Sequence, residues 1–156
     1  MENEFVFVDL GLPSGILWAD KNVWAHHSYQ GGAMTPFDEI NEWEEFLPTY
    51  DEFAELINSC DFSSSLVQSP DGSFAVVKVT GPNGNYIYLP TVDSMPGLIG
   101  DRVIGLWSQT AFGSDSHGFM LVQLSALILS FYNIDNITIG VTTNDTPRMV
   151  RFVKRP

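Results

Sequence analysis

The sequence predicts one α+β domain spanning residues 1–156, and three observations lead to this prediction. A length of 156 residues with 44% apolar residues is enough to build one buried core. A well-capped amphipathic helix lies in the first half of the chain, whereas β-rich segments separated by turn residues dominate the second half. Helices early and strands late favour an antiparallel sheet over alternating βαβ units.

The best-defined element is a helix that begins after Thr49. Thr49 and Glu52 have the T-x-x-E spacing of a capping box, and the acids of the first turn suit the positive end of the helix dipole. Its apolar stripe, at spacings i, i+3, i+4 and i+7, comprises Phe53, Leu56, Ile57 and Cys60. Because Cys60 is the only cysteine, a disulfide within the chain is excluded, and we expect this thiol to be a small buried hydrophobe.

A second helix is expected to open at Thr35. Pro36 occupies the first helical position and Asp38 follows three residues after Thr35. One face of this helix would carry Phe37, Ile40 and Trp43. Residues 26–34, by contrast, have the composition of a loop.

The remaining elements are predicted as strands, and Trp18, Leu89 and Trp107 are predicted to belong to the core. The clearest hairpin joins residues 74–80 and 85–89 around the turn Gly81-Pro82-Asn83-Gly84. The other expected strands are residues 5–10, 16–19, 104–108, 119–124, 127–132, 137–142 and 149–154, with residues 119–124 and 127–132 paired around Ser125-Ala126.

The charge distribution argues against nucleic acid as a partner. The formal net charge is −12, from 19 acids and 7 bases, and such a chain repels phosphate backbones. Four of the bases lie in the last nine residues, namely Arg148, Arg151, Lys154 and Arg155. We expect them to pair with the chain's own acids or with a neighbouring subunit, which leaves homo-oligomer formation open.

Targeting signals are not evident in the sequence. The first residues, MENEFVFVDL, contain two acids and no basic region, and the longest apolar stretch, residues 119–131, is too short for a membrane span. We therefore expect no membrane insertion. The expected location is the cytoplasm, or a virion or cell exterior reached without a classical signal peptide.

No constellation for catalysis or cofactor binding is evident. His26 and His27 are adjacent and would point to opposite sides of an extended backbone, and His117 lies in the loop-like run GSDSHG. H-E-x-x-H, C-x-x-C, phosphate-loop and dinucleotide-binding patterns are all missing from the sequence. The expectation is a protein that is not an enzyme and has neither a metal site nor a cofactor.

Five segments together resemble the Fibrobacter succinogenes major paralogous domain, a family abundant in gut Bacteroidota. The run VDLGLPSGILWADKNVWA at residues 8–25 is similar to the opening of that domain. LPTYDEFAELINSC, VKVTGPNGNYIYLP, LWSQT and PRMVRFVKRP resemble its helix, its hairpin, a later strand and its terminal strand, in the same order.

The resemblance implies a C-type-lectin-like fold and a binding function. Relatives with this fold bind glycans or proteins through an irregular face built from the last third of the chain. The sequence departs from the family at Lys21, where the family usually has cysteine, and residues 24–46 match poorly. The EPN, QPD and WND triplets of calcium-dependent lectins are missing, so calcium-mediated sugar binding is not expected.

Three loop-like segments are the candidate ligand-binding face: residues 111–118, 132–136 and 142–145. They combine aromatic side chains with short polar ones, a composition suited to adaptable contacts. The candidate ligand-binding residues are Phe112, Ser114, Asp115, His117, Tyr132, Asn133, Asn136, Thr143, Asn144 and Asp145.

Two functions remain open at this point. The first is a non-catalytic binding module, displayed on a cell surface or a virion, that recognises a glycan or a protein. The second is a structural phage virion protein, such as a head decoration, fibre or tail component, whose contacts are with neighbouring virion proteins. Display on a particle would reconcile a family that is usually exported with an N-terminus that lacks an export signal.

Overall fold

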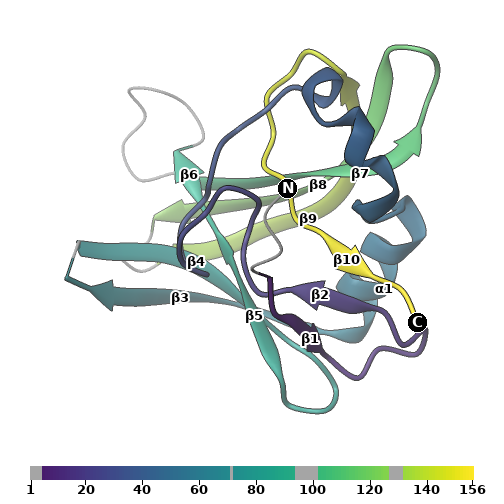
Figure 1. Ribbon diagram of the computed structural model, residues 1–156. Helices are drawn as coiled ribbons and strands as arrows, with labels where there is room; N and C mark the ends of the chain where they lie inside the picture. The colour runs from purple at the N-terminus through teal and green to yellow at the C-terminus, as the bar shows by residue number, and fades with distance from the viewer. Residues whose placement is uncertain (1–4, 71, 94–101, 127–131) are drawn as a thin grey trace.

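The computed structural model describes residues 5–70, 72–93, 102–126 and 132–156 (Figure 1). The helices are the 3-10 helices η1 (Phe37–Glu39) and η2 (Asn41–Phe46) and the α-helix α1 (Tyr50–Ser59). The strands are β1 (Phe7–Asp9), β2 (Leu17–Ala19), β3 (Asp61–Ser69), β4 (Gly72–Thr80), β5 (Tyr86–Pro90), β6 (Val92–Asp93), β7 (Arg102–Ala111), β8 (Ser116–Ala126), β9 (Tyr132–Thr143) and β10 (Val153–Lys154). These elements confirm the predicted α+β class.

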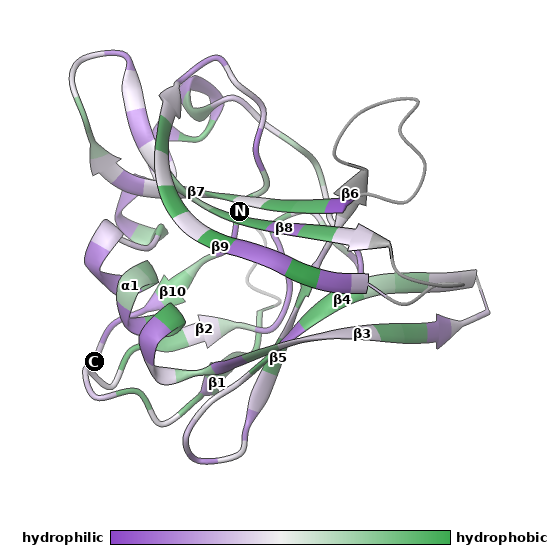
Figure 2. Ribbon diagram, turned by 180° about the vertical axis from the view of Figure 1, so that it is seen from behind, coloured by the Kyte–Doolittle hydropathy of each residue, from purple (hydrophilic) through white to green (hydrophobic). Residues whose placement is uncertain are grey.

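The strands form three antiparallel sheets, with the orders β1-β2-β10, β3-β4-β5 and β6-β7-β8-β9. The first sheet joins the two ends of the chain, because β10 pairs with β2 through Val153 and Trp18 (Figure 1). The two larger sheets meet where β3 lies beside β9, and the Ser64 hydroxyl donates to the Tyr132 carbonyl over 2.6 Å. Along β9, apolar and polar residues alternate (Figure 2), as expected for a strand with one buried face.

Two clusters of buried side chains make up the core. The larger one packs α1 against β4, β5, β7 and β8, with Trp18 and Leu89 fully buried in it. The smaller one surrounds Trp107, which is also fully buried and donates its indole N–H to the Thr35 carbonyl over 2.7 Å. The predicted core positions of these three residues are confirmed.

Helix α1 follows the sequence prediction closely. The Thr49 hydroxyl accepts from the Glu52 N–H and the Glu52 carboxylate accepts from the Thr49 N–H, so the capping box is complete. Cys60 lies at the C-cap, 9% exposed. Its burial is as predicted, and burial, with smaller contributions from the Asp61 and Glu55 carboxylates, raises the pKa of the Cys60 thiol to about 11.

The predicted helix at Thr35 is wrong in type. Residues 37–46 form two short 3-10 helices, and the N-cap of the first is Pro36, which has no side-chain hydrogen bond to offer. Thr35 is instead held in an antiparallel bridge with Arg148, so it cannot cap the helix. The expected apolar face is nevertheless present, since Phe37 and Ile40 are buried and Trp43 packs against the smaller cluster.

Most predicted strands are confirmed, with three differences and one segment outside the described residues. The predicted turn at Ser125-Ala126 is wrong, because both residues lie in β8 and pair with Asn133 and Tyr132 of β9. The hairpin of β4 and β5 has the expected turn, but β3, residues 61–69, was not predicted at all. The last strand is only Val153–Lys154, whereas residues 149–154 were predicted. Of the expected strand 127–132, only Tyr132 is described, and it begins β9.

Two of the four basic residues near the C-terminus, Arg151 and Arg155, bond other groups of the same chain. Arg151 is fully buried and donates to the Asn22 carboxamide oxygen over 2.6 Å and to the Ala19 and Tyr88 carbonyls over 2.8 and 2.7 Å. Burial lowers the pKa of its guanidinium to about 9. Arg155 forms an ion pair with Glu52, which confirms the expectation that a tail base pairs with one of the chain's own acids.

Candidate functional site

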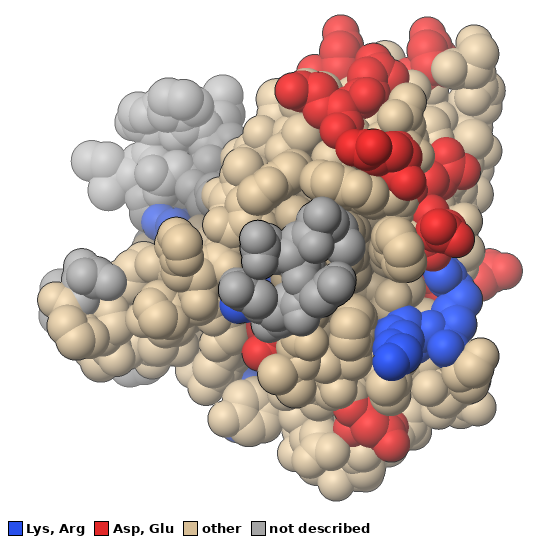
Figure 3. All heavy atoms as spheres, in the orientation of Figure 1, with Lys and Arg blue, Asp and Glu red and all other residues tan. Residues whose placement is uncertain are grey.

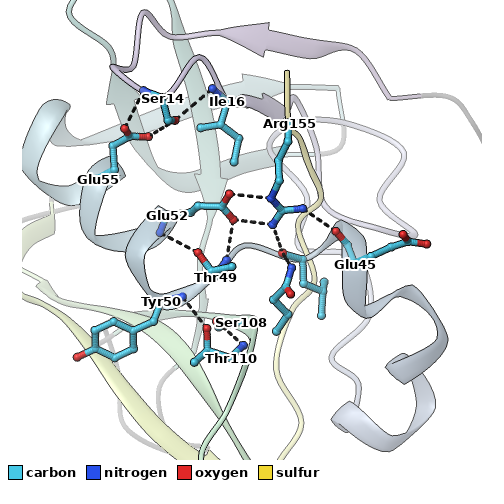
Figure 4. A network of polar contacts seen from close by, with 12 residues as sticks. Ser14, Ile16, Glu45, Thr49, Tyr50, Glu52, Glu55, Ser108, Thr110 and Arg155 are labelled. Atoms are coloured by element: carbon cyan, nitrogen blue, oxygen red, sulfur yellow. Dashed lines mark hydrogen bonds and ion pairs between the residues drawn. The ribbon is translucent and has the colours of Figure 1, made fainter.

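The N-terminal turn of α1 lies against the end of β7, and this contact positions the candidate site (Figure 4). The Tyr50 N–H donates to the Thr110 hydroxyl oxygen over 2.9 Å, and the Thr110 N–H donates to the Ser108 hydroxyl oxygen over 3.1 Å. Gln109 reinforces the junction, because its backbone N–H and its carboxamide donate to the Pro48 and Leu47 carbonyls. The first turn of the helix is therefore fixed relative to the sheet.

An ion pair holds the same turn from its other side. The Arg155 guanidinium donates to both carboxylate oxygens of Glu52 over 2.8 and 2.6 Å (Figure 4). It also donates to the Glu45 and Leu47 carbonyls over 2.6 and 2.9 Å. Glu52 is also half of the capping box, so its carboxylate connects the start of α1 to Arg155 in the C-terminal segment. Arg155 in turn connects both to the end of η2 through the Glu45 carbonyl.

A pocket of about 350 Å³ opens beside this turn, and we call it the tip pocket. Its lining residues are Thr49, Tyr50, Asp51, Thr110, Phe112, Ile139 and Val141. The Tyr50 and Phe112 rings meet edge to face with centroids 5.8 Å apart, yet 37% and 43% of these residues stay exposed. Two adjacent, exposed aromatic rings over an open pocket offer an apolar binding surface that the core does not require.

The loop from Phe112 to Asp115 connects β7 to β8 beside the tip pocket. The Phe112 N–H donates to the Ser116 carbonyl over 2.9 Å, which closes the loop. Ser114 and Asp115 are exposed within it. The Asp115 carbonyl accepts from the Asn144 N–H over 2.7 Å, so the predicted segments 111–118 and 142–145 do lie together.

Two of the predicted ligand-binding side chains make contacts within the protein. His117 was expected in a loop but lies in β8, 8% exposed, with its ring stacked on Phe37 at a centroid distance of 3.6 Å. Its Nδ1 atom is 2.7 Å from the Asn144 carboxamide oxygen. Asn144 also accepts from the Phe37 N–H through its carbonyl, so this group joins β8, η1 and the segment after β9.

Thr143 and Asp145 lie at the surface where β9 ends. The Thr143 hydroxyl donates to the Asp145 carboxylate over 2.6 Å, and both residues are exposed. Val141, which lines the tip pocket, lies two residues before Thr143 on the same strand. Together with Ser114 and Asp115, Thr143 and Asp145 are the polar members of the predicted set that remain exposed at this end of the sheet.

The segment of Tyr132, Asn133 and Asn136 was predicted to be a loop, and this prediction is wrong. All three residues lie in β9, which pairs with β8 along its whole length. The composition suggested a loop because Asn and Asp are frequent in turns, but here the backbone pairs with β8. The Asn133 carboxamide donates to the Asp135 carboxylate, and the Asn136 carboxamide donates to the Gln123 side chain on β8. At about 3.3 Å per residue, Asn136 is roughly 23 Å along the strand from Thr143. The predicted residues therefore form two separate groups.

The sequence prediction missed Tyr50, Asp51, Thr110 and Val141. Asp51 was assigned only to the helix dipole, and Tyr50 was not considered. A usable signal was present, because Tyr50 is an aromatic residue in the first helical turn that does not belong to the apolar stripe of α1. Its meeting with β7 joins residues 60 positions apart, which local patterns do not reveal.

Metal-binding and membrane-spanning features were sought in the part of the chain that the structure describes. Among residues 5–70, 72–93, 102–126 and 132–156, no group of three or more His, Cys, Asp or Glu side chains is arranged to hold a metal ion. Within the same residues, no helix has the length and apolar character needed to cross a membrane.

Comparison of the chain with models of protein families, with curated proteins and with solved structures finds no match. The class of the protein therefore follows from its own structure. It is a mostly antiparallel α+β protein with an open, aromatic pocket where α1 meets the β7–β8 hairpin.

Proposed function

We propose that the protein is a non-catalytic binding module that recognises a carbohydrate at the tip pocket. The observation that carries this proposal is the exposed pair of Tyr50 and Phe112, held edge to face over a pocket of about 350 Å³. Aromatic rings left in water cost hydration free energy unless a ligand covers them. A rigid aromatic surface at a fixed helix end is typical of a binding site rather than of a mobile loop.

The polar groups around these rings suit a polyhydroxylated ligand. The Asp51 carboxylate is exposed in the pocket lining and accepts hydrogen bonds. The Thr110 hydroxyl oxygen accepts from the Tyr50 N–H, which leaves its own hydrogen free to be donated. Sugar rings present apolar C–H faces and hydroxyl edges together, so they match aromatic rings flanked by a carboxylate and a hydroxyl.

We further propose a C-type-lectin-like architecture for the fold and display of the module on a virion or cell surface. Support comes from the places where the family-like segments lie. The opening run, residues 8–25, overlaps β1 and contains β2, and LPTYDEFAELINSC contains α1. VKVTGPNGNYIYLP covers the end of β4, the turn and β5. LWSQT falls in β7, and the final run contains β10. Each segment thus contains or overlaps one or two elements that contribute to the core.

Glycan-array binding by the full chain tests the carbohydrate proposal. We expect Phe112→Ala and Tyr50→Ala each to weaken binding by about tenfold or more, since buried aromatic contacts dominate binding energy. Asn136→Ala is the matched control, because Asn136 does not line the tip pocket and its carboxamide donates to the Gln123 side chain on β8. Far-ultraviolet circular dichroism checks that the variants are folded. No bound glycan, or equal binding by Phe112→Ala, would contradict the proposal.

Display on a particle is tested separately. Mass spectrometry of purified phage particles and of the cytosol of infected cells should find the protein in the particles. Its absence from particles, together with abundance in the cytosol, would contradict this part of the proposal without affecting carbohydrate binding.

A further inference from the structure

A second aromatic surface lies outside the tip pocket, and each of its rings lies beside the next one in space. Trp24 and Trp43 have ring centroids 5.5 Å apart, and Trp43 and Phe152 follow at 6.1 Å. Phe152 also contacts Phe46 at 5.6 Å and Phe5 at 5.5 Å, and Phe5 contacts Phe7 at 6.4 Å. We call this set the aromatic groove; its members are Trp24, Trp43, Phe46, Phe152, Phe5 and Phe7.

One end of the aromatic groove is a pocket of about 400 Å³. Phe152, 2% exposed, is a buried part of its wall, whereas Phe46 is 40% exposed. Four phenylalanine rings and Val153 line the pocket, and its polar lining comes from Glu45, Lys154 and Arg155. A cavity of this size accepts a large apolar side chain of a partner.

The other end of the groove is Trp24, which is 49% exposed and has a φ of 66°. A bulky residue rarely adopts this left-handed region, because its Cβ approaches the following carbonyl. The Ala25 N–H donates to the Asn22 carbonyl over 3.1 Å, which closes a turn around Trp24, and Asn22 itself is fully buried and bonded to Arg151 and to the Gly31 carbonyl. The fold thus holds an indole in water at a cost in conformational energy, and tryptophan is the residue most enriched at interface hot spots.

The rim of the aromatic groove is negatively charged. Glu42, Glu44 and Glu45 are exposed on η2, the element that also carries Trp43 and Phe46. Acidic side chains gather over η1 and η2 in the upper part of the face shown in Figure 3. Lys154 is the cation on the rim, its ammonium 5.9 Å from the Phe7 ring, whereas Arg155 is neutralised by Glu52. Three carboxylates against one such ammonium leave this rim with a net negative charge.

We propose that the aromatic groove docks a basic segment of a partner protein. An apolar or aromatic side chain of that segment enters the pocket lined by Phe46 and Phe152, and a lysine or arginine lies against Trp24 and the η2 glutamates. Aromatic faces attract cations, and carboxylates beside them strengthen the attraction. An aromatic centre with a charged rim is also the usual anatomy of a protein–protein interface. This surface is separate from the tip pocket, so the inference does not depend on the carbohydrate proposal.

Binding of short synthetic peptides to the full chain tests the inference. One set combines a tryptophan or leucine with two arginines at varied spacing, and a matched set carries glutamate in place of each arginine. Fluorescence anisotropy measures affinity, and the indole N–H resonances of Trp24 and Trp43 report where a peptide binds. We expect the basic set to bind, the acidic set not to bind, and the affinity of the basic set to fall as salt is added.

Variants then locate the site. Trp24→Ala and Phe46→Ala should each weaken peptide binding by about tenfold or more. Both side chains are substantially exposed, so the fold should survive these changes. Glu42→Gln with Glu44→Gln should reduce the salt dependence, and Phe112→Ala, at the tip pocket, should leave the affinity unchanged.

Four outcomes would overturn the inference. Equal binding of the basic and acidic sets would show that charge plays no part, and loss of binding in Phe112→Ala would place the peptide at the tip pocket. Binding of no basic peptide at all would show that the groove does not dock such a segment. Self-association in analytical ultracentrifugation that Trp24→Ala abolishes would identify a second copy of the chain as the occupant.

Discussion

Replacing Glu52 with alanine should remove two separate interactions with one substitution. The carboxylate caps the N-terminus of α1 through the Thr49 N–H at 2.8 Å and pairs with Arg155 at 2.6 Å. Loss of the hydrogen bond from the Thr49 N–H, which is one half of the capping box, should cost about 1 kcal/mol. The ion pair contributes only about 0.5–1 kcal/mol, because the Arg155 side chain is 36% exposed and water screens it. Together the loss in unfolding free energy should be about 2 kcal/mol.

Urea unfolding followed by tryptophan fluorescence measures this loss, and the melting temperature should fall by roughly 4–8 °C. Glu44→Ala is the control, since Glu44 is an exposed acid on η2 and its substitution should stay within about 0.5 kcal/mol. A double-mutant cycle with Arg155→Met should give a coupling energy of about 0.5–1 kcal/mol. The reasoning is refuted if Glu52→Ala is no more destabilising than Glu44→Ala, or if the cycle shows no coupling.

Two further predictions concern the buried thiol and a tight turn. Because the Cys60 thiol titrates near 9.0 when unfolded and near 11 when folded, its contribution to stability should be complete below pH 9 and lost as the pH rises through 11. Urea unfolding measured from pH 7 to 11 should therefore show that the wild type loses about 2–3 kcal/mol of unfolding free energy at alkaline pH, whereas Cys60→Ala does not. The same dependence of unfolding free energy on pH in both proteins would contradict this prediction. Gly81→Ala should cost about 3 kcal/mol, because its Cβ would collide with the Leu10 carbonyl. Gly84 has a φ of 89°, and a Cβ added there would meet no atom, so Gly84→Ala should lower the unfolding free energy by only about 1 kcal/mol in the same assay. Similar losses of unfolding free energy in both variants would argue against the collision at Gly81.

The parts of the fold that the sequence predicted are those with local signals. The capping box of α1 lies within four residues, and the β4–β5 hairpin is marked by a turn of glycine, proline and asparagine. Each signal uses side-chain chemistry that acts at short range. Both elements therefore could be located without knowledge of the packing around them.

The parts that were missed depend on partners distant in the sequence. Strand β3, DFSSSLVQS, has serines where an apolar strand would show its pattern, and its ladder with β4 defines it instead. The Tyr132–Asn136 segment reads as a turn by composition, but pairing with β8 makes it a strand. The lining of the tip pocket comes from α1, from β7 and the loop after it, and from β9. Of its two aromatic residues, the sequence predicted Phe112 as ligand-binding but not Tyr50.

The sheet that joins the chain ends has a consequence for synthesis on the ribosome. Trp18 is paired with Val153, and Asn22 bonds Arg151 across 129 positions, so the first sheet cannot close until residues 151–154 have been translated. At about 5–20 residues per second, the N-terminal strands wait roughly 6–26 s for their partners. During that interval the apolar face around Trp18 is exposed in the nascent chain. The protein should therefore engage chaperones while it is being made, and this part of the fold should complete only after residues 151–154 have emerged from the exit tunnel.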